Sequence, residues 1–126
     1  MKEIKTTKAQ SAVGLLSQAI ETNGLIFTSG FIHVKPNGPM VEGSTEDKLK
    51  QIMTNIEEVL KAGGSSLSDI TKATIYVTDM SILGDFDKLY VTYFDEPLPA
   101  REAVCVKELP LGASIEVSVV AKKGER

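Results

Sequence analysis

The chain has 126 residues, a formal net charge of -3 and 42% hydrophobic residues, which is an ordinary composition for a globular protein. This length allows one hydrophobic core, so residues 1–126 are expected to form a single domain. The acidic balance argues against a nucleic-acid partner, because phosphate binding depends on Lys and Arg.

The single cysteine, Cys105, cannot form an internal disulfide, and the N-terminus lacks the apolar core of a signal peptide. Both features favour a reducing, cytoplasmic location. No apolar stretch approaches the roughly 18 residues that a membrane span needs, so no membrane partner is expected. One cysteine and one histidine also leave too few ligands for a structural zinc site, and we expect neither a metal nor another cofactor.

The first half of the chain predicts strands followed by a helix. A short strand is expected around residues 3–6, and Asn23-Gly24 predicts a hairpin between strands 18–22 and 25–32. Ser44 is typical of a helix N-cap, and the helix should end at Gly63-Gly64. One face of this helix carries apolar residues at helical spacing: Leu49, Ile52, Met53, Ile56, Val59 and Leu60.

The second half predicts a strand over 70–78, a helix over about 81–94, and final strands over about 101–107 and 113–122. Pro97 and Pro99 should stop the second helix. After the short strand around residues 3–6, the predicted order of strands and helices is therefore ββαβαββ. It predicts an α+β fold with a single mixed or antiparallel β-sheet and two helices packed on one face.

This packing leaves the other sheet face without a helix. The last strand, residues 114–120, carries apolar residues on both parities towards its end, which a water-facing strand should not. We therefore expect the uncovered face to be buried against another copy of the chain.

Arg101 and Glu116 are the candidate site residues. Arg101 begins a strand after a proline-rich turn, and it is either a surface arginine or a guanidinium fork for a substrate carboxylate. Glu116 lies between Ile115 and Val117, and it either points outward or is a half-buried carboxylate that exchanges a proton with water. We expect the two final strands to pair as a hairpin, whose register the sequence does not fix.

Two other reactive side chains are assigned to structure rather than chemistry. Cys105 lies in an alternating strand with no histidine or lysine beside it, so core or interface packing is expected rather than a nucleophilic role. His33 lies between Ile32 and Val34, where a solvent-facing or hydrogen-bonded role is expected rather than catalysis.

The sequence resembles the RidA family, also called YjgF and, by older names, the endoribonuclease L-PSP or translation-inhibitor family. The matching segments run through nearly the whole chain: Gly14 with Gln18, Phe27-Thr28-Ser29-Gly30, Ile70 to Met80, Phe86 to Phe94, and Pro99-Ala100-Arg101 with Ile115-Glu116-Val117. Each is weak alone, but their order and spacing together are specific.

The resemblance implies a trimer similar to chorismate mutase, with ligand pockets at the subunit boundaries. It implies metal-independent hydrolysis of imines or enamines, such as 2-aminoacrylate and 2-iminobutanoate, to 2-keto acids and ammonia. Arg101 and Glu116 would be catalytic, and Arg101 would bind the substrate carboxylate. Ser29, Gly30 and Asp87 would also line the substrate site.

The sequence also departs from the family pattern. Leu15-Leu16 stands where the family has a pocket tyrosine, and Asp87 where an asparagine is common. Ala103 stands where many members have a cysteine. The missing tyrosine and Asp87 keep a second hypothesis open, a non-catalytic regulatory trimer that binds small carboxylates. A ribonuclease or translation inhibitor is the least favoured reading, because the chain is acidic and lacks a pair of histidines.

Overall fold

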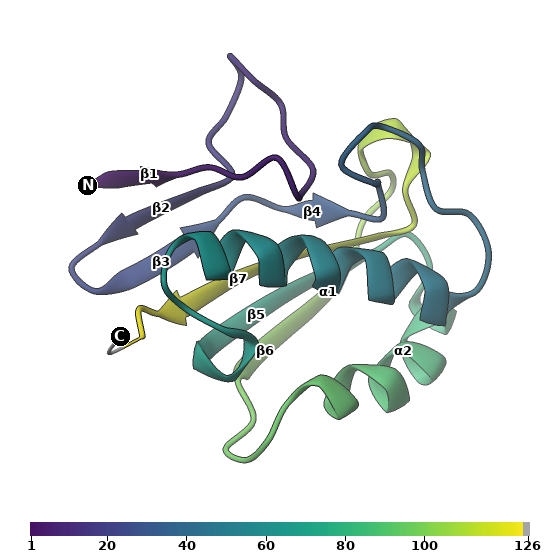
Figure 1. Cartoon of the computed structure of the whole chain (residues 1–126). Coiled ribbons are helices and arrows are strands. Elements are labelled where there is room, and N and C mark those ends of the chain that lie inside the picture. The colour runs from purple at the N-terminus through teal and green to yellow at the C-terminus, as the bar shows by residue number, and fades with distance from the viewer. Residues whose placement is uncertain (125–126) are drawn as a thin grey trace.

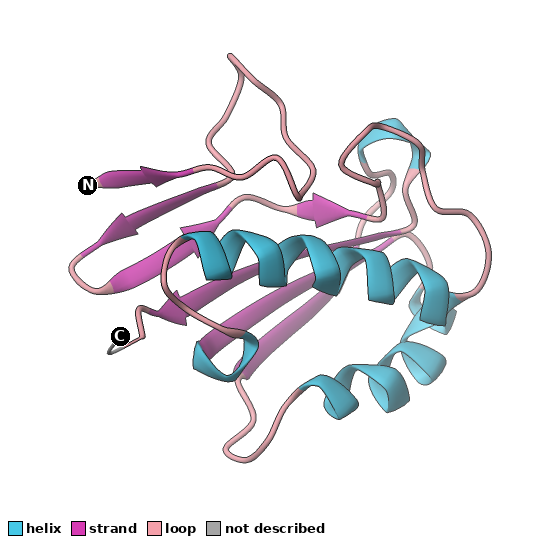
Figure 2. Cartoon of the chain, in the orientation of Figure 1, coloured by secondary structure: helices cyan, strands magenta, loops and turns pink. Residues whose placement is uncertain are grey.

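The computed structural model describes residues 1–124, and the seven strands that they form join one mixed sheet. Figure 1 shows both helices lying over the same face of this sheet, and Figure 2 shows the loops that connect the elements. The sheet order is β1-β2-β3-β7-β5-β6, and β4 pairs with β7 beside β3. The elements are β1 (Lys2–Ile4), β2 (Ala19–Thr22), β3 (Leu25–Thr28), β4 (Phe31–Ile32), α1 (Thr45–Ala62), β5 (Ile70–Val77), α2 (Leu83–Tyr90), β6 (Ala100–Cys105) and β7 (Ile115–Lys122).

The predicted α+β class with both helices on one face is confirmed. The predicted hairpin at Asn23-Gly24 is also confirmed, since both residues have positive φ, 52° and 79°, as the tight turn between β2 and β3 requires. The second helix is shorter than expected, because short 3₁₀ turns flank α2 at Met80–Ile82 and Val91–Tyr93.

The strand expected over 25–32 is broken into β3 and β4. Both halves pair with β7, and the break falls at Ser29 and Gly30. The Thr28 hydroxyl spans the interrupted ladder, because its Oγ1 accepts a hydrogen bond of 3.0 Å from the backbone N–H of Val119. The break therefore interrupts the strand opposite the middle of β7, but the backbone N–H of Val119 keeps a hydrogen-bond partner.

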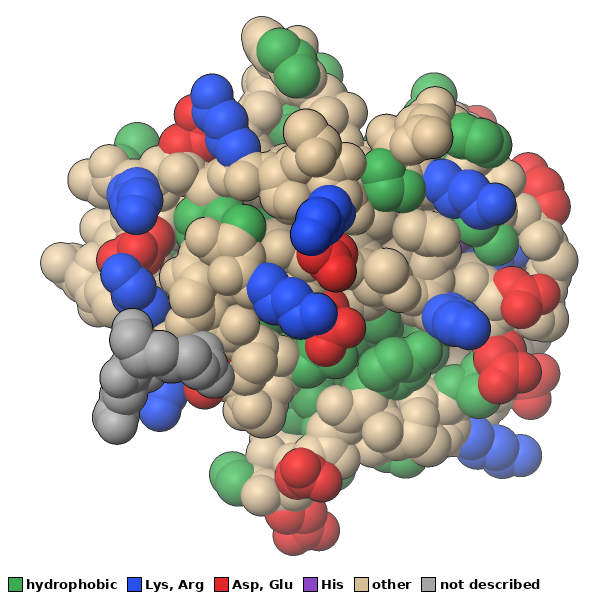
Figure 3. Space-filling view, viewed as in Figure 1, with side chains coloured by type: hydrophobic (Ala, Val, Ile, Leu, Met, Phe, Trp, Pro, Cys, Tyr) green, Lys and Arg blue, Asp and Glu red, His purple; other side chains and the backbone are tan. Residues whose placement is uncertain are grey.

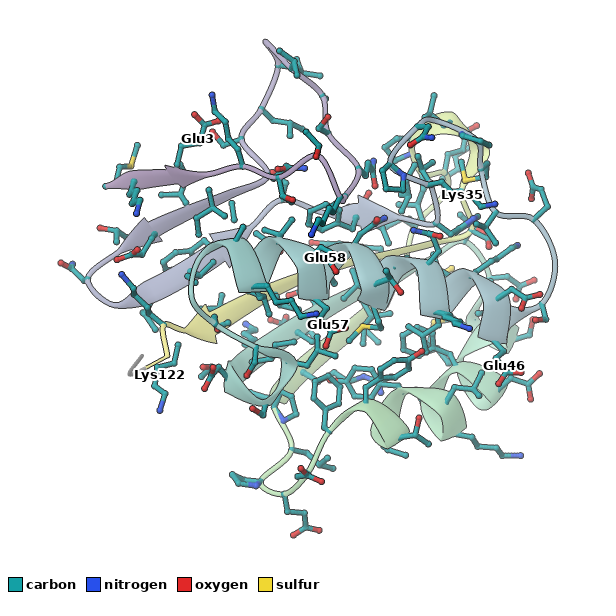
Figure 4. The ribbon with its side chains drawn as sticks, viewed as in Figure 1. Glu3, Lys35, Glu46, Glu57, Glu58 and Lys122 are labelled. Carbon is teal, nitrogen blue, oxygen red and sulfur yellow. The ribbon has the colours of Figure 1, made fainter. Side chains whose placement is uncertain are left out.

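Helix α1 begins as predicted. The Ser44 side chain accepts a hydrogen bond from the N–H of Asp47, and Glu46 lies in the first turn at the N-terminal end of α1 (Figure 4), where a negative charge suits the helix dipole. Its apolar face is buried against the sheet, with all six predicted core residues at most 2% exposed: Leu49, Ile52, Met53, Ile56, Val59 and Leu60.

The predicted hairpin between the last two strands is wrong. Strand β6 pairs in parallel with β5, and β5 lies between β6 and β7. Helix α2 supplies the crossover that a parallel pair requires, which a tight turn cannot. The turn at Pro110–Gly112 instead leads back past β5 to its other edge.

The two faces of the sheet differ in what covers them. On β7 the residues Ile115, Val117, Val119 and Ala121 are buried on the helix side. On the opposite face, Ile20, Phe27 and Val120 lie in register across β2, β3 and β7. Phe27 is 43% exposed, so this open face presents an apolar row to solvent in one chain, as the sequence predicted.

The helix-covered side has a mixed surface. Figure 3 shows Lys and acidic side chains interspersed over this side, with no large area of one sign. Such a face lacks the concentrated positive charge of a nucleic-acid interface. Within residues 1–124, no helix has both the length and the apolar character that crossing a membrane requires.

His33 is a buried hydrogen-bonding residue. It is 1% exposed, its Nδ1 lies 2.8 Å from the Val41 carbonyl oxygen, and its Nε2 accepts a 3.0 Å hydrogen bond from the N–H of Ser114. The ring is therefore neutral, with its proton on Nδ1. Burial is the main cause that lowers the pKa of His33, and Lys48 nearby adds to it. His33 thus ties the end of β4 to the start of β7.

We predict that acid destabilises the fold through His33. Because the folded-state pKa lies below the unfolded value of 6.5, the neutral ring stabilises the fold above pH 6.5, and this is lost as pH falls through the folded pKa. The free energy of unfolding measured with urea should therefore be lower at pH 5.5 than at pH 7.5.

His33→Gln should be less stable at pH 7.5 but should show a smaller change over this interval. His33 is the single histidine of the chain, so the difference between the two proteins isolates its titration. If the free energies of unfolding of the two proteins changed equally with pH, the assignment of the pH dependence to His33 would be wrong.

Candidate functional site

Arg101 lies at the edge of the sheet, against α2. Its Nη2 donates a 2.5 Å hydrogen bond to Asp87 Oδ1, which also makes an ion pair. Its guanidinium carbon lies 4.9 Å from the centre of the Tyr90 ring and 5.7 Å from that of Phe86. Aromatic faces attract a cation, so these rings hold the guanidinium in place. The Arg101 side chain is 24% exposed.

Glu116 lies on the open face of the sheet, over Gly30. A Cβ atom on Gly30 would lie 2.4 Å from Glu116 Oε2 and 2.7 Å from its Cδ. Glycine is therefore required at position 30 for space, since any side chain would push the Glu116 carboxylate away. Partial burial raises the pKa of Glu116, which favours a proton acceptor that works closer to neutral pH.

Ser29 precedes Gly30 at the break between β3 and β4. Its hydroxyl donates a 2.7 Å hydrogen bond to the Ser17 carbonyl, and its backbone N–H donates to the Gln18 carbonyl. Ser29, Gly30 and Leu16 border a hollow of about 30 Å³, together with Gln10, Ser11, Ala12, Gln18 and Phe31. This hollow has room for about one water molecule, so a larger ligand needs walls from elsewhere.

The structure brings these residues together in two separate groups. Arg101 pairs in register with Ala73, a buried residue of the helix-covered face, whereas Glu116 lies on the open face. Strand β5 also separates β6 from β7. Arg101 and Asp87 therefore form one group, and Ser29, Gly30 and Glu116 form another. A ligand that touches both groups of a single chain would have to pass around the sheet.

The structure alters the expectation for Asp87. The sequence predicted a substrate-binding residue, but Asp87 contacts Arg101 itself. Direct contact between Asp87 and a substrate stays a prediction. Tyr90 and Phe86 are two further residues of this group that sequence reasoning did not assign to the site. Tyr90 is three residues from Asp87 and four from Phe86 along α2, and this spacing is a signal that could have found Tyr90, since residues three or four apart share a helix face.

Cys105 is exposed at the end of β6, so the expected packing in the core of the chain is wrong. Packing at a subunit interface stays a prediction. Among residues 1–124, no three His, Cys, Asp or Glu side chains gather as metal ligands would. A hollow of about 450 Å³ lies between the start of β5 and the loop 94–99, and its lining includes neither Arg101 nor Glu116.

The chain is thus a small α+β protein with two candidate groups on opposite faces of its sheet, Arg101 with Asp87 and Glu116 with Ser29 and Gly30. The family model described as Endoribonuclease L-PSP matches residues 6–123. The chain therefore belongs to this family, which is the RidA/YjgF family that the sequence resembles.

Two curated relatives cover almost the whole chain. A RutC family protein of Aquifex aeolicus is 44% identical over 126 residues, covering 98% of this chain and all of the relative. The mouse 2-iminobutanoate/2-iminopropanoate deaminase is 38% identical over 124 residues, covering 98% of this chain and 92% of the relative. The family thus includes imine deaminases.

Two solved structures share the fold. RidA from the Antarctic bacterium Psychrobacter sp. PAMC 21119 superposes with a TM-score of 0.91 at 32% identity, covering 97% of this chain and 99% of the other. TdcF of E. coli, solved with bound serine, gives 0.90 at 29% identity, covering 98% and 100%. A small amino acid therefore binds to a protein of this fold.

We predict that Glu116→Gln stabilises the protein at neutral pH. The folded-state pKa of Glu116 lies above the unfolded value of 4.5, so the group favours folding most when protonated, and this contribution is lost as pH rises through the folded pKa. The glutamine carries no charge to bury. Its Tm should exceed that of the wild type at pH 7.5, and the gap should close below pH 4.5.

Glu102→Gln is the matched control for Glu116→Gln. Glu102 is exposed on β6 and pairs with Lys72, which lowers its pKa, so its charge favours the fold. Its replacement should leave the Tm at pH 7.5 unchanged or slightly lower. A Glu116→Gln protein with a lower Tm than the wild type at pH 7.5 would contradict the conclusion that burying the Glu116 charge destabilises the fold.

Proposed function

We propose that residues 1–126 act as one domain that hydrolyses 2-imino acids and their enamine tautomers, such as 2-iminobutanoate and 2-aminoacrylate, to 2-keto acids and ammonia. Arg101 would bind the substrate carboxylate, and Glu116 would activate water. The observation that carries the proposal is the half-buried Glu116 carboxylate over Gly30. The same chain also holds the Arg101 guanidinium against the Tyr90 ring. The names of the mammalian relatives support the same reaction.

The reaction asks for only modest help from the protein. Water adds to the carbon of the protonated C=N bond while the Glu116 carboxylate takes a proton from that water, and a neutral carbinolamine forms. The Glu116 carboxyl group then gives this proton to the nitrogen. As the C=O bond forms and ammonia departs, the Glu116 carboxylate takes the hydroxyl proton and passes it to solvent. A positioned acid–base group contributes about 10²–10⁴-fold. Ser29 and Gly30 would border the water, and Arg101 would hold the carboxylate.

We propose that each complete site forms between two chains of a homotrimer. In one chain Arg101 and Glu116 lie on opposite faces of the sheet, and the hollow beside Gly30 has a volume of only about 30 Å³. The apolar row Ile20, Phe27 and Val120 offers a surface for a second copy. Packing of the open face would bring Glu116 of one chain towards Arg101 of the next. The cytoplasmic location inferred from the single cysteine stays a prediction.

A regulatory trimer that binds small carboxylates without turnover is the second candidate. Two observations favour it: Leu16 occupies the wall beside Ser29, and Asp87 already pairs with Arg101. Binding of 2-ketobutyrate without turnover would support this function. A ribonuclease is the least favoured, since the chain is acidic. RNA degradation that Glu116→Ala abolishes would revive that function.

The deaminase function is tested by coupling the protein to a threonine dehydratase and following keto-acid release. The wild type should accelerate release, and Arg101→Ala should lose at least about tenfold in kcat/KM, because the carboxylate loses a charged partner. Glu116→Gln should lose at least about 10²-fold in kcat, because water loses its base. No acceleration by the wild type, or full activity of Arg101→Ala, would refute the function.

Gly30→Ala tests whether activity depends on the position of the Glu116 carboxylate, independently of the stability of the fold. The new methyl group would displace the flexible end of the Glu116 side chain, so activity should fall while the Tm changes little. Gly84→Ala is the matched control, because a Cβ atom there meets nothing within 4 Å. It should keep full activity.

The trimer is tested by light scattering and a charge on the open face. Val117 and Val119 of β7 both face the helices and are 1% and 3% exposed, so a charge there would disrupt the core instead of testing the open face. Phe27→Glu should instead convert a particle of about three times 13.6 kDa to the monomer and abolish activity. Val91→Glu, at a residue 45% exposed beyond α2, is the control and should keep the assembly. A monomeric wild type at micromolar concentration would overturn the shared site.

A further inference from the structure

The only ion pair that Arg101 makes among the described residues is internal. A guanidinium can offer two parallel N–H groups to a carboxylate along either of two edges, and Nη2 belongs to both edges. Asp87 binds this Nη2. Asp87 therefore occupies one of these edges. It also places a negative charge beside the other edge, where an incoming carboxylate would experience repulsion.

The two aromatic rings keep Arg101 in this arrangement. The guanidinium lies against Tyr90 and Phe86 of α2, the helix that also carries Asp87. Asp87 and Tyr90 are three residues apart, so they lie on neighbouring positions of the helix surface. A ligand carboxylate must displace Asp87 from Nη2 or bind beside it while Arg101 stays on the rings.

We propose that Asp87 is a specificity-determining residue that competes with ligand carboxylates for Arg101. The inference rests on the proposed function, in which Arg101 binds the substrate carboxylate. The Asp87 side chain is 51% exposed, so water screens the pair and a ligand can replace it at modest cost. With Asp87 competing for Arg101, a ligand binds well only if a second group, such as an imine or keto group, makes a further contact at Glu116.

The opposite role for Asp87 makes the opposite prediction. If Asp87 positions Arg101 for the ligand, then neutralising Asp87 weakens binding. If Asp87 competes, then neutralising it strengthens binding. Asp87→Asn distinguishes the two, because asparagine keeps the size of the side chain and removes its charge.

The test measures binding of pyruvate and of its uncharged amide, pyruvamide, by calorimetry. Asp87→Asn should lower the Kd for pyruvate by about two- to fivefold, the range expected for one exposed ion pair, and leave the Kd for pyruvamide unchanged. The gain should shrink in high salt. Asp85→Asn is the matched control, because it removes the same charge from the same helix at a residue beside Ser44 and Lys88. It should leave both constants unchanged.

A second measurement uses the arginine reagent phenylglyoxal and needs neither turnover nor substrate. The sequence has two arginines, Arg101 and Arg126, so mass analysis of peptides assigns the modified one. Arg101 should react faster in Asp87→Asn than in the wild type or Asp85→Asn. Equal rates at Arg101, or a pyruvate Kd that is unchanged or raised by Asp87→Asn, would overturn the competition.

The two proposals fail in different ways. If the wild type releases no keto acid but Asp87→Asn binds pyruvate more tightly, then the deaminase function fails and the competition stands. If the wild type is an active deaminase and Asp87→Asn changes neither pyruvate binding nor the reactivity of Arg101, then the competition fails and the function stands.

Discussion

The structure depends on the strict alternation of β7, which lies between β3 and β5 and packs beneath α1. Its residues Ile115 to Ala121 bury every second side chain at 3% exposure or less, so the strand cannot slip by one residue without moving four apolar side chains into water. This constraint places Glu116 on the open face. It also fixes Glu116 beside β4, where the break at Gly30 leaves room for its carboxylate.

The break between β3 and β4 shows how the same sheet supports stability and chemistry. Thr28 restores a hydrogen bond that the interrupted ladder would otherwise lose, and Ser29 bonds to the loop before β2. Hydrogen bonds of Thr28 and Ser29 therefore precede a position that has no side chain. Burying Glu116 there raises its pKa, which costs stability at neutral pH and suits a group that takes up a proton.

Arg101 is held by a different part of the fold. The parallel pairing of β5 with β6 requires a crossover, and α2 provides it. The same helix brings Phe86, Asp87 and Tyr90 against the arginine, so the topology of the sheet determines the surroundings of Arg101. Because this group lies on the other side of the sheet from Glu116, a complete site at a subunit boundary is the arrangement that the proposed function requires.

The sequence determined the local elements, since hairpin turn, helix cap and apolar spacing depend on neighbouring residues. Asn23-Gly24, Ser44 and the buried face of α1 all lie as predicted. Arg101 and Glu116 were also chosen from the sequence as candidate site residues, as charged residues in apolar strands, and their functional role stays a prediction. Only the tertiary structure decided which strands pair, because pairing joins residues far apart in the chain, and it replaced the expected final hairpin with β6 beside β5. That exchange separated Arg101 from Glu116 and brought Asp87 to Arg101, contacts that local patterns do not encode.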